Sequence, residues 1–140
     1  MAAQLEDHKV NVRIRLSALW TAVMFCYIYG DYFELYVPGK TQGLLNGQNL
    51  LDSPEKLFVA TIILTIPALM IFLSLILPPR SAKWLNIGTG LFFTLFTLWV
   101  GISSASAWRA FYVFLSVLES IITAFIVWQA WTWEKVKTEE

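Results

Sequence analysis

Long hydrophobic runs, separated by short polar stretches, divide the chain into four segments. The runs cover about residues 16–36, 57–77, 84–102 and 108–131. A helix rises about 1.5 Å per residue, so about 20 apolar residues cross a hydrocarbon core of about 30 Å. The pattern predicts an all-α fold, an integral membrane four-helix bundle that forms a single domain over residues 1–140.

Proline and serine residues mark the expected helix ends. Ser53, one residue before a proline, is typical of an N-cap and predicts that the second helix starts near residue 57. The Pro78-Pro79 pair should end that helix, and Ser81 is expected to cap the third, which would begin near residue 84. The polar residues 37–56 are expected to form a loop.

The composition supports a membrane protein and excludes several classes of function. The chain is 57% hydrophobic and 14% charged, with a formal net charge of zero, so nothing indicates a nucleic-acid partner. A single cysteine, Cys26, cannot form an internal disulfide, and a single histidine, His8, cannot supply bis-histidine haem or a di-iron bundle. We expect no cofactor and no metal site.

The basic residues predict the orientation in the membrane. Four spans put both termini on one side, and seven basic residues fall on that side against three on the other. The positive-inside rule then places the N and C termini in the cytoplasm of a multi-pass protein of the inner (plasma) membrane. The seven are Lys9, Arg13, Arg15, Arg80, Lys83, Lys135 and Lys137, and the three are Lys40, Lys56 and Arg109.

The last hydrophobic segment carries a polar stripe at helical spacing, formed by Arg109, Tyr112, Ser116, Glu119 and Thr123. Glu119 lies near the middle of the segment. A carboxyl group at membrane depth is costly, and it marks a functional site by default. Because burial disfavours the charged form, we expect Glu119 to be a protonated acid.

A protonated Glu119 needs hydrogen-bond partners. Tyr27 and Thr65 lie at similar predicted depths, and Pro67 leaves the backbone carbonyl of Ile63 without its helical donor. Glu119 could therefore donate to that carbonyl or accept from Tyr27. Such a bond could serve only to hold two helices together, or it could belong to a proton-linked or ligand-linked site.

The first segment carries a second stripe, formed by Ser17, Trp20, Met24, Tyr27, Asp31 and Glu34. Lipid cannot hydrate such groups, so both stripes are expected to face the bundle interior or a water-filled cavity. Arg109 should lie level with Glu34 and pair with Glu34 or Asp31, since unpaired charges are costly at a low-dielectric rim.

Small residues follow the third segment at a four-residue step. Thr97, Gly101 and Ala105 share one surface, with Gly88 and Gly90 below them. Small residues let helix backbones approach closely. The surface could pack within one bundle or form a dimer interface, so a homo-oligomer stays open.

A specific motif lies in the first hydrophobic segment, and the resemblance that it carries extends over all four segments. Residues 16–40, LSALWTAVMFCYIYGDYFELYVPGK, contain LSALW followed by YIYGDYFELYVPG. With this motif the chain resembles a family of small uncharacterised bacterial membrane proteins, described only as a domain of unknown function. The resemblance implies a four-helix membrane fold and supplies no activity.

Three functions are compatible with these features of the sequence. The leading hypothesis is a non-enzymatic membrane protein that binds or transports a small cationic or lipophilic ligand in a polar aromatic pocket. The alternative is a structural or accessory subunit whose polar seam only specifies helix packing. A lipid-modifying enzyme is third, because the chain shows no nucleophile–base pair and no phosphate-binding glycine loop. The candidate ligand-binding residues are Tyr27, Asp31, Tyr32, Glu34, Trp108, Arg109, Tyr112 and Glu119.

Overall fold

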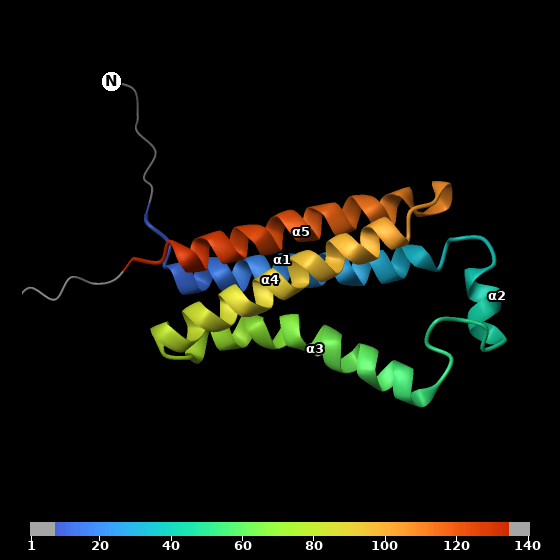
Figure 1. Ribbon diagram of the computed structural model, residues 1–140, viewed down its shortest axis with the longest axis horizontal. Coiled ribbons are helices and arrows are strands. Elements are labelled where there is room, and N and C mark those ends of the chain that lie inside the picture. The colour runs from blue at the N-terminus through green and yellow to red at the C-terminus, as the bar shows by residue number, and fades with distance from the viewer. Residues whose placement is uncertain (1–7, 135–140) are drawn as a thin grey trace, which may run out of the picture.

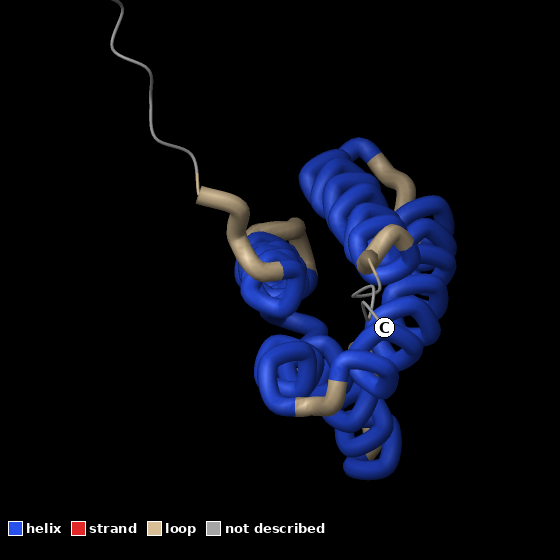
Figure 2. Tube along the Cα trace, turned by 90° about the vertical axis from the view of Figure 1, so that its left-hand side faces the viewer, coloured by secondary structure: helices blue, strands red, loops and turns tan. Residues whose placement is uncertain are grey.

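The computed structural model of the protein describes residues 8–134, and within that range it contains helices and loops but no strand. Figure 2, seen along the molecule from the end that holds both termini, shows this arrangement. Lys135 and Lys137, which contributed to the predicted orientation, lie outside the described residues. In chain order the elements are α1 (Val12–Glu34), α2 (Lys40–Leu45), α3 (Pro54–Ile76), α4 (Pro79–Ser103), the short 3-10 helix η1 (Ala107–Arg109) and α5 (Ala110–Trp131).

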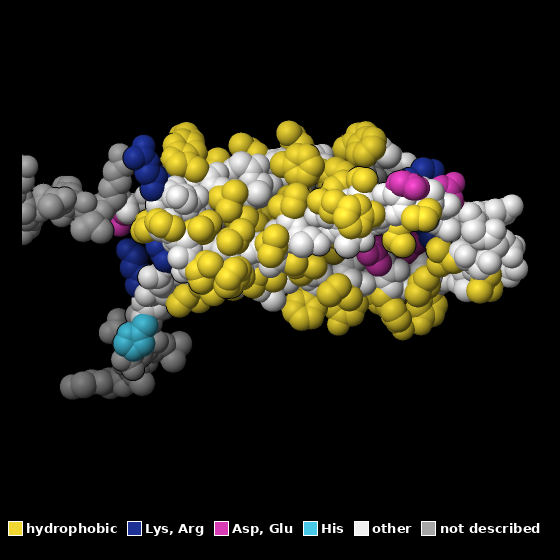
Figure 3. Space-filling view, turned by 90° about the horizontal axis from the view of Figure 1, so that it is seen from below, with side chains coloured by type: hydrophobic (Ala, Val, Ile, Leu, Met, Phe, Trp, Pro, Cys, Tyr) yellow, Lys and Arg dark blue, Asp and Glu magenta, His cyan; other side chains and the backbone are white. Residues whose placement is uncertain are grey.

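Four of these helices are long and apolar enough to cross a membrane: α1, α3, α4, and α5 together with η1. Figure 3 shows one long face of the molecule, where hydrophobic side chains cover the middle and charged side chains gather towards the two ends. The predicted all-α fold with four apolar helices of spanning length is therefore confirmed.

The long helices do not pack equally. α4 and α5 lie side by side, α1 packs against α5 and α3, and α3 makes fewer contacts with α4. In Figure 1, α3 lies close to the other helices near the chain termini and diverges from them towards α2. Pro67 lies within α3 and is buried; a proline inside a helix removes one backbone hydrogen bond and favours a bend. The α3 helix therefore packs with the other helices near the chain termini and separates from them towards α2.

Close packing between α4 and α5 depends on two glycines of α4. A Cβ atom at Gly101 would lie 2.7 Å from Ser116 Cβ, and a Cβ at Gly90 would lie 2.7 Å from Val127 Cγ2. Both distances are too short for a real side chain, so these positions admit only glycine at this helix separation. Of the two interpretations of the small-residue surface, packing within one bundle accounts for Gly90 and Gly101.

A buried hydrogen-bond network joins three helices near the chain termini. Trp20 Nε1 of α1 donates to Asn86 Oδ1 of α4 at 2.7 Å, and Asn86 Nδ2 donates to Ser74 Oγ of α3 at 3.1 Å. All three side chains are fully buried or nearly so. Apolar side chains of α1, α3, α4 and α5 surround the network and form the core: Leu16, Val23, Met70, Ile87, Phe93, Ile126 and Ala130.

Two details of the predicted helix ends differ from the structure. The Ser53 N-cap is confirmed, since Ser53 Oγ accepts from Lys56 N at 3.3 Å. Ser81 caps nothing, because α4 already begins at Pro79, where a fixed φ and a missing N–H suit the first helical position. The predicted loop 37–56 contains the short helix α2, which lies between Gly39 and Gly47, both at positive φ.

The two ends of the described chain lie at the same end of the molecule (Figure 1). Lys9 Nζ lies 3.9 Å from Glu134 Oε2, which brings the residues before α1 next to those after α5. We refer to this end as the terminal end and to the opposite one, which carries α2, as the α2 end.

Candidate functional site

The site begins with an ion cluster at the α2 end. Arg109 Nη2 donates to Glu34 Oε1 at 2.7 Å, and Lys40 Nζ donates to the same oxygen at 3.0 Å. Glu34 ends α1, Lys40 begins α2, and Arg109 lies in η1, so one carboxylate ties three elements together. The expected pairing of Arg109 with an acidic residue of the first helix is confirmed, with Glu34 as its partner.

A pocket of about 640 Å³ lies on the outer side of this cluster. Lys40 and Arg109 form part of its wall, and the connection between α1 and α3 supplies most of the rest. Asp52 also lines it. A hydrogen bond from Lys56 Nζ at 2.6 Å holds the pKa of the Asp52 carboxyl below its usual range, so Asp52 is a charged residue of the pocket wall at neutral pH.

Below the ion cluster, α1 and α5 bring the predicted polar residues together. Gly30 of α1 faces Tyr112 of α5, and a Cβ at that position would lie 3.7 Å from the Tyr112 ring, in ordinary van der Waals contact. Tyr112 lies within electrostatic range of Asp31, Glu34 and Glu119, and Tyr27 within range of Glu119. We use the name acidic cluster for Tyr27, Asp31, Glu34, Arg109, Tyr112 and Glu119.

Several polar groups of the acidic cluster have no hydrogen-bond partner among residues 8–134. Tyr27 Oη and Glu34 Oε2 are buried without one. The Glu119 side chain is 5% exposed, yet no donor from the described chain reaches its carboxyl group. Buried polar groups are almost always hydrogen-bonded, so unpaired groups gathered at one place mark candidate partners for a proton, a water molecule or a ligand.

The structure does not bring every predicted site residue into the cluster. Tyr32 is 48% exposed and shares a hydrogen bond with Tyr36, with 2.8 Å between the two hydroxyl oxygens. Trp108 is 67% exposed. Asp31 is also exposed, which corrects the prediction that the whole stripe of the first helix faces the interior. In Figure 3, acidic side chains are visible on the surface among hydrophobic ones towards the α2 end.

Glu119 does not form the hydrogen bonds predicted for it with residues of the described chain. Thr65 is exposed, and its hydroxyl donates to Thr61 O of its own helix at 2.7 Å. Tyr27 Oη has no hydrogen-bond partner in the described part of the chain, so it does not donate to Glu119. The prediction assumed that α3 stays level with the other helices, whereas α3 diverges from them towards α2 (Figure 1).

The polar stripe of α5 divides into two parts with different partners. Thr123 Oγ1 accepts from Thr94 at 2.8 Å, and Ser120 and Thr97 share a hydrogen bond of 2.7 Å, so this part joins α5 to α4. Ser116 packs against Gly101 through its Cβ. These residues support helix packing, while Glu119 and Tyr112 point to α1 and remain unpaired.

Two residues of interest escaped the sequence analysis. Asn86 gave no signal, because a single polar residue that follows no stripe looks like any interfacial asparagine. The sequence indicates Lys40 only as a basic residue of the predicted loop. Its contact with Glu34 depends on the turn after Pro38-Gly39, which brings the chain back to the end of α1. Within residues 8–134, no three His, Cys, Asp or Glu side chains are grouped so as to hold a metal ion.

Comparison with known proteins identifies the family but no activity. A model described as a family of unknown function (DUF6326) matches residues 4–139, nearly the whole chain. The chain therefore belongs to this family, and the resemblance read from its first hydrophobic segment is confirmed. No curated protein and no solved structure matches the chain.

Proposed function

We propose that this member of the family is a multi-pass protein of the inner (plasma) membrane that binds a small organic cation at the acidic cluster. Its termini face the cytoplasm, and the α2 end faces outwards. The pocket beside Lys40 and Arg109 is the entrance, and Glu119 is a deeper proton site. Transport of the ligand would use the same residues in sequence.

The observation that carries this proposal is the excess of unpaired acceptors. The acidic cluster contains three carboxyl groups, at Asp31, Glu34 and Glu119, and the cations at them are Arg109 and the adjacent Lys40. Both cations share the single oxygen Oε1 of Glu34. Asp31 and Glu34 Oε2 thus keep negative charge available, and Glu119 can add a further charge by releasing its proton. A cationic ligand is the species that such a site attracts most strongly.

The aromatic residues of the cluster suit an organic cation better than a hydrated metal ion. The faces of Tyr27 and Tyr112 can contact a quaternary or aromatic cation, a contact worth about 0.5–2 kcal/mol each. Tyr27 also packs against Phe93, with ring centroids 6.4 Å apart, so its orientation is held from the α4 side. The proposed ligand is therefore an apolar body with a single positive charge.

Binding of tetraphenylphosphonium to the purified full-length protein in detergent tests the proposal. Asp31→Asn and Glu119→Gln should each weaken binding by about fivefold or more, since a factor of ten corresponds to about 1.4 kcal/mol. Glu55→Gln is the matched control, because it removes a carboxylate of the first turn of α3, outside the cluster. Unchanged affinity in both cluster variants would remove the mechanism.

The same titration at two pH values tests the role of Glu119. If the cation displaces a proton from this carboxyl group, the parent protein binds more tightly as the pH rises from 6 to 8. The Glu119→Gln variant has no proton to release there, so its affinity should vary less with pH. Equal pH dependence in the two proteins would count against a proton site at Glu119.

The alternative function, in which the polar residues only specify helix packing, is supported by a different part of the two polar stripes. The hydroxyl pairs Thr94–Thr123 and Thr97–Ser120 are satisfied within the bundle, as expected for groups that specify helix packing. If the whole seam has that role, Asp31→Asn and Glu119→Gln will alter thermal stability in detergent without changing the affinity for any cation.

A further inference from the structure

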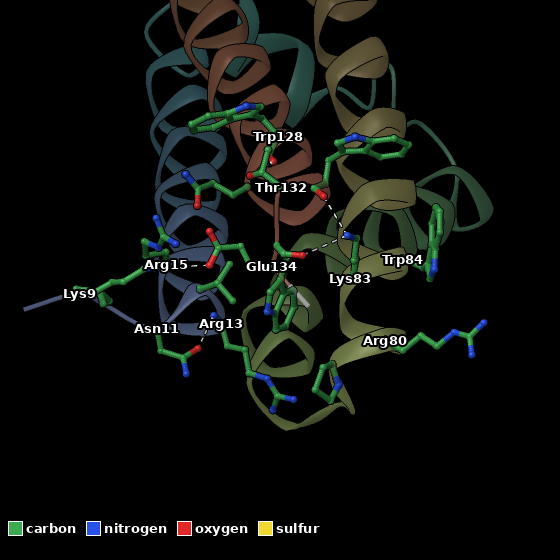
Figure 4. Close-up of a pocket in the computed structure, with 16 residues that line it drawn as sticks. Lys9, Asn11, Arg13, Arg15, Arg80, Lys83, Trp84, Trp128, Thr132 and Glu134 are labelled. Atoms are coloured by element: carbon green, nitrogen blue, oxygen red, sulfur yellow. Dashed lines mark hydrogen bonds and ion pairs between the residues drawn. The ribbon is translucent and has the colours of Figure 1, made fainter. Parts of the chain in front are cut away.

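A second and larger hollow lies at the terminal end, at the opposite end of α1 from Glu34. Its volume is about 1480 Å³. The residues before α1, the first turns of α1 and α4 and the end of α5 line it, as the close-up in Figure 4 shows. We call it the terminal groove. It shares no residue with the acidic cluster.

The lining of the terminal groove is strongly basic. Five cationic side chains and one carboxylate, Glu134, belong to it. Glu134 forms an ion pair with Lys9 at 3.9 Å, and both side chains are 86% exposed, so water screens this contact. The five cationic residues are Lys9, Arg13, Arg15, Arg80 and Lys83.

Two of these cations already have a structural role. Arg13 Nη1 donates to Leu75 O at 3.0 Å, near the end of α3, and Lys83 Nζ donates to Trp131 O at 2.9 Å, at the end of α5. Both satisfy carbonyl groups that a helix end leaves without donors. Arg13 also lies 5.9 Å from the ring centroid of Trp133.

Arg15 and Arg80 have no such role. Neither has a hydrogen-bond or ion-pair partner among residues 8–134, and both are exposed. They extend on opposite sides of the terminal groove (Figure 4). α1 and α4 both begin at this groove, and helix N-termini carry partial positive charge, which adds to the field of the two free guanidinium groups.

Tryptophan side chains give the groove an amphipathic edge. Trp84 and Trp131 meet edge to face, with ring centroids 6.4 Å apart, and Trp128 lies one turn before Trp131. All three are more than half exposed, and the exposed apolar surface of the spanning helices continues from them. Indole rings favour the boundary between lipid headgroups and acyl chains.

From this combination we propose that the terminal groove binds the headgroup of an anionic phospholipid of the adjacent leaflet. The charges of Arg15 and Arg80 attract the headgroup from the two sides of the groove, and the tryptophans contact the glycerol and the first methylene groups. A soluble phosphate would meet only the cations and leave the aromatic edge unused.

Titration of the full-length protein in detergent, followed by native mass spectrometry, tests this site. The probes are phosphatidylglycerol, phosphatidylcholine with the same acyl chains, and glycerol 3-phosphate. The parent protein should bind phosphatidylglycerol about 25-fold more tightly than phosphatidylcholine, because Arg15 and Arg80 near an anionic headgroup each contribute about a factor of five. Glycerol 3-phosphate should bind far more weakly than either lipid.

The variants Arg15→Gln and Arg80→Gln should each weaken phosphatidylglycerol binding about fivefold, and the double variant should bind the two lipids alike. Lys56→Gln is the control, since Lys56 is an exposed basic residue at the α2 end. Equal binding of both lipids to the parent, or a preference that survives in the double variant, would overturn the assignment. Glycerol 3-phosphate binding as tightly as phosphatidylglycerol would make this a soluble-anion site instead.

If the double variant does not fold, the two single variants decide the question, because each exposed arginine can be replaced without breaking a contact to the described chain. These outcomes are independent of cation binding at the acidic cluster. The lipid site can therefore stand or fall without affecting the proposed function.

Discussion

The side chain of Asn86 shows how one residue can connect a bundle. Its amide group offers an acceptor and two donors, and the protein uses them to reach α1, α3 and the backbone of α4 at Ala82 O. Neither leucine nor serine could make these three contacts at once. The residue is fully buried, so water cannot replace a lost partner.

Replacing Asn86 with leucine should lower the free energy of unfolding in detergent by about 1–2 kcal/mol, because Trp20 Nε1 would stay buried without an acceptor. Thr65→Val is the matched control. It also removes a polar group from a spanning helix, but Thr65 is exposed and bonds only within α3. Equal effects of the two variants would show that the network contributes nothing to stability.

The α4–α5 pair packs more closely than α3 packs against the bundle. Glycine on α4 and small hydroxyl residues on α5 allow close contact, and the hydroxyl pairs across it are satisfied. By contrast, α3 meets the bundle mainly through its second half, after Pro67, where Met70 and Ser74 are buried. Its first half presents apolar side chains to the surroundings, among them Phe58, which is 66% exposed.

The α4–α5 contact predicts different effects for two glycines of the same helix. Gly101→Ala should destabilise the protein by about 1–3 kcal/mol, because the new Cβ would overlap Ser116 Cβ and force the helices apart. Gly88→Ala should leave stability unchanged or raise it by up to about 1 kcal/mol, because nothing lies within 4 Å of its added Cβ.

Thermal unfolding of both glycine variants in the same detergent measures this difference. A stable Gly101→Ala protein would mean that α4 and α5 are farther apart than in the structure. A Gly88→Ala protein as unstable as Gly101→Ala would indicate instead that a second copy covers the open surface around Gly88.

At the scale of the whole molecule, the charges at the two ends differ in kind. The terminal end combines cations with tryptophans around an open groove. The α2 end combines carboxylates with two cations, Lys40 and Arg109, that contact the same oxygen of Glu34. A protein with this asymmetry has a preferred orientation in a membrane, since basic residues are retained on the cytoplasmic side. In the proposed orientation, the two proposed ligand sites lie on opposite sides of the membrane.

Cysteine labelling tests the orientation. In a Cys26→Ala background, the variant Gln48→Cys should react with a membrane-impermeant maleimide in intact cells. The variant Thr138→Cys should react only after the membrane is permeabilised. Gln48 is suitable because it lies in the exposed connection at the α2 end. Labelling of Thr138→Cys in intact cells would reverse the proposed orientation and place the terminal groove outside.

Much of the fold could be predicted because it depends on local patterns. Hydrophobic runs of spanning length fixed the number of long helices, and Ser53 and the Pro78-Pro79 pair located helix ends to within a few residues. The rise per residue of a helix was enough to predict that Arg109 and Glu34 lie at the same height along the bundle. These features need only the sequence around them.

The composition of the acidic cluster could be predicted only in part. Helical periodicity placed Tyr27, Asp31, Glu34, Tyr112 and Glu119 on common faces, but it could not say which side of each helix a neighbour would cover. Tyr32 and Trp108 lie outside the cluster, because no other helix packs over them. The partners expected for Glu119 were wrong, because α3 diverges from the bundle and periodicity contains no information about helix angles.

The sequence by itself thus determined the all-α class, the four apolar helices and the levels at which charges occur, since these follow from hydrophobicity and a fixed rise per residue. Only the tertiary structure decided which polar groups are satisfied and which are not. It assigned Ser120 and Thr123 to helix packing, left Glu119 and Tyr27 Oη unpaired, and assembled the terminal groove from residues far apart in the chain. Those outcomes depend on the angles and distances between helices, which are set by packing across the whole bundle.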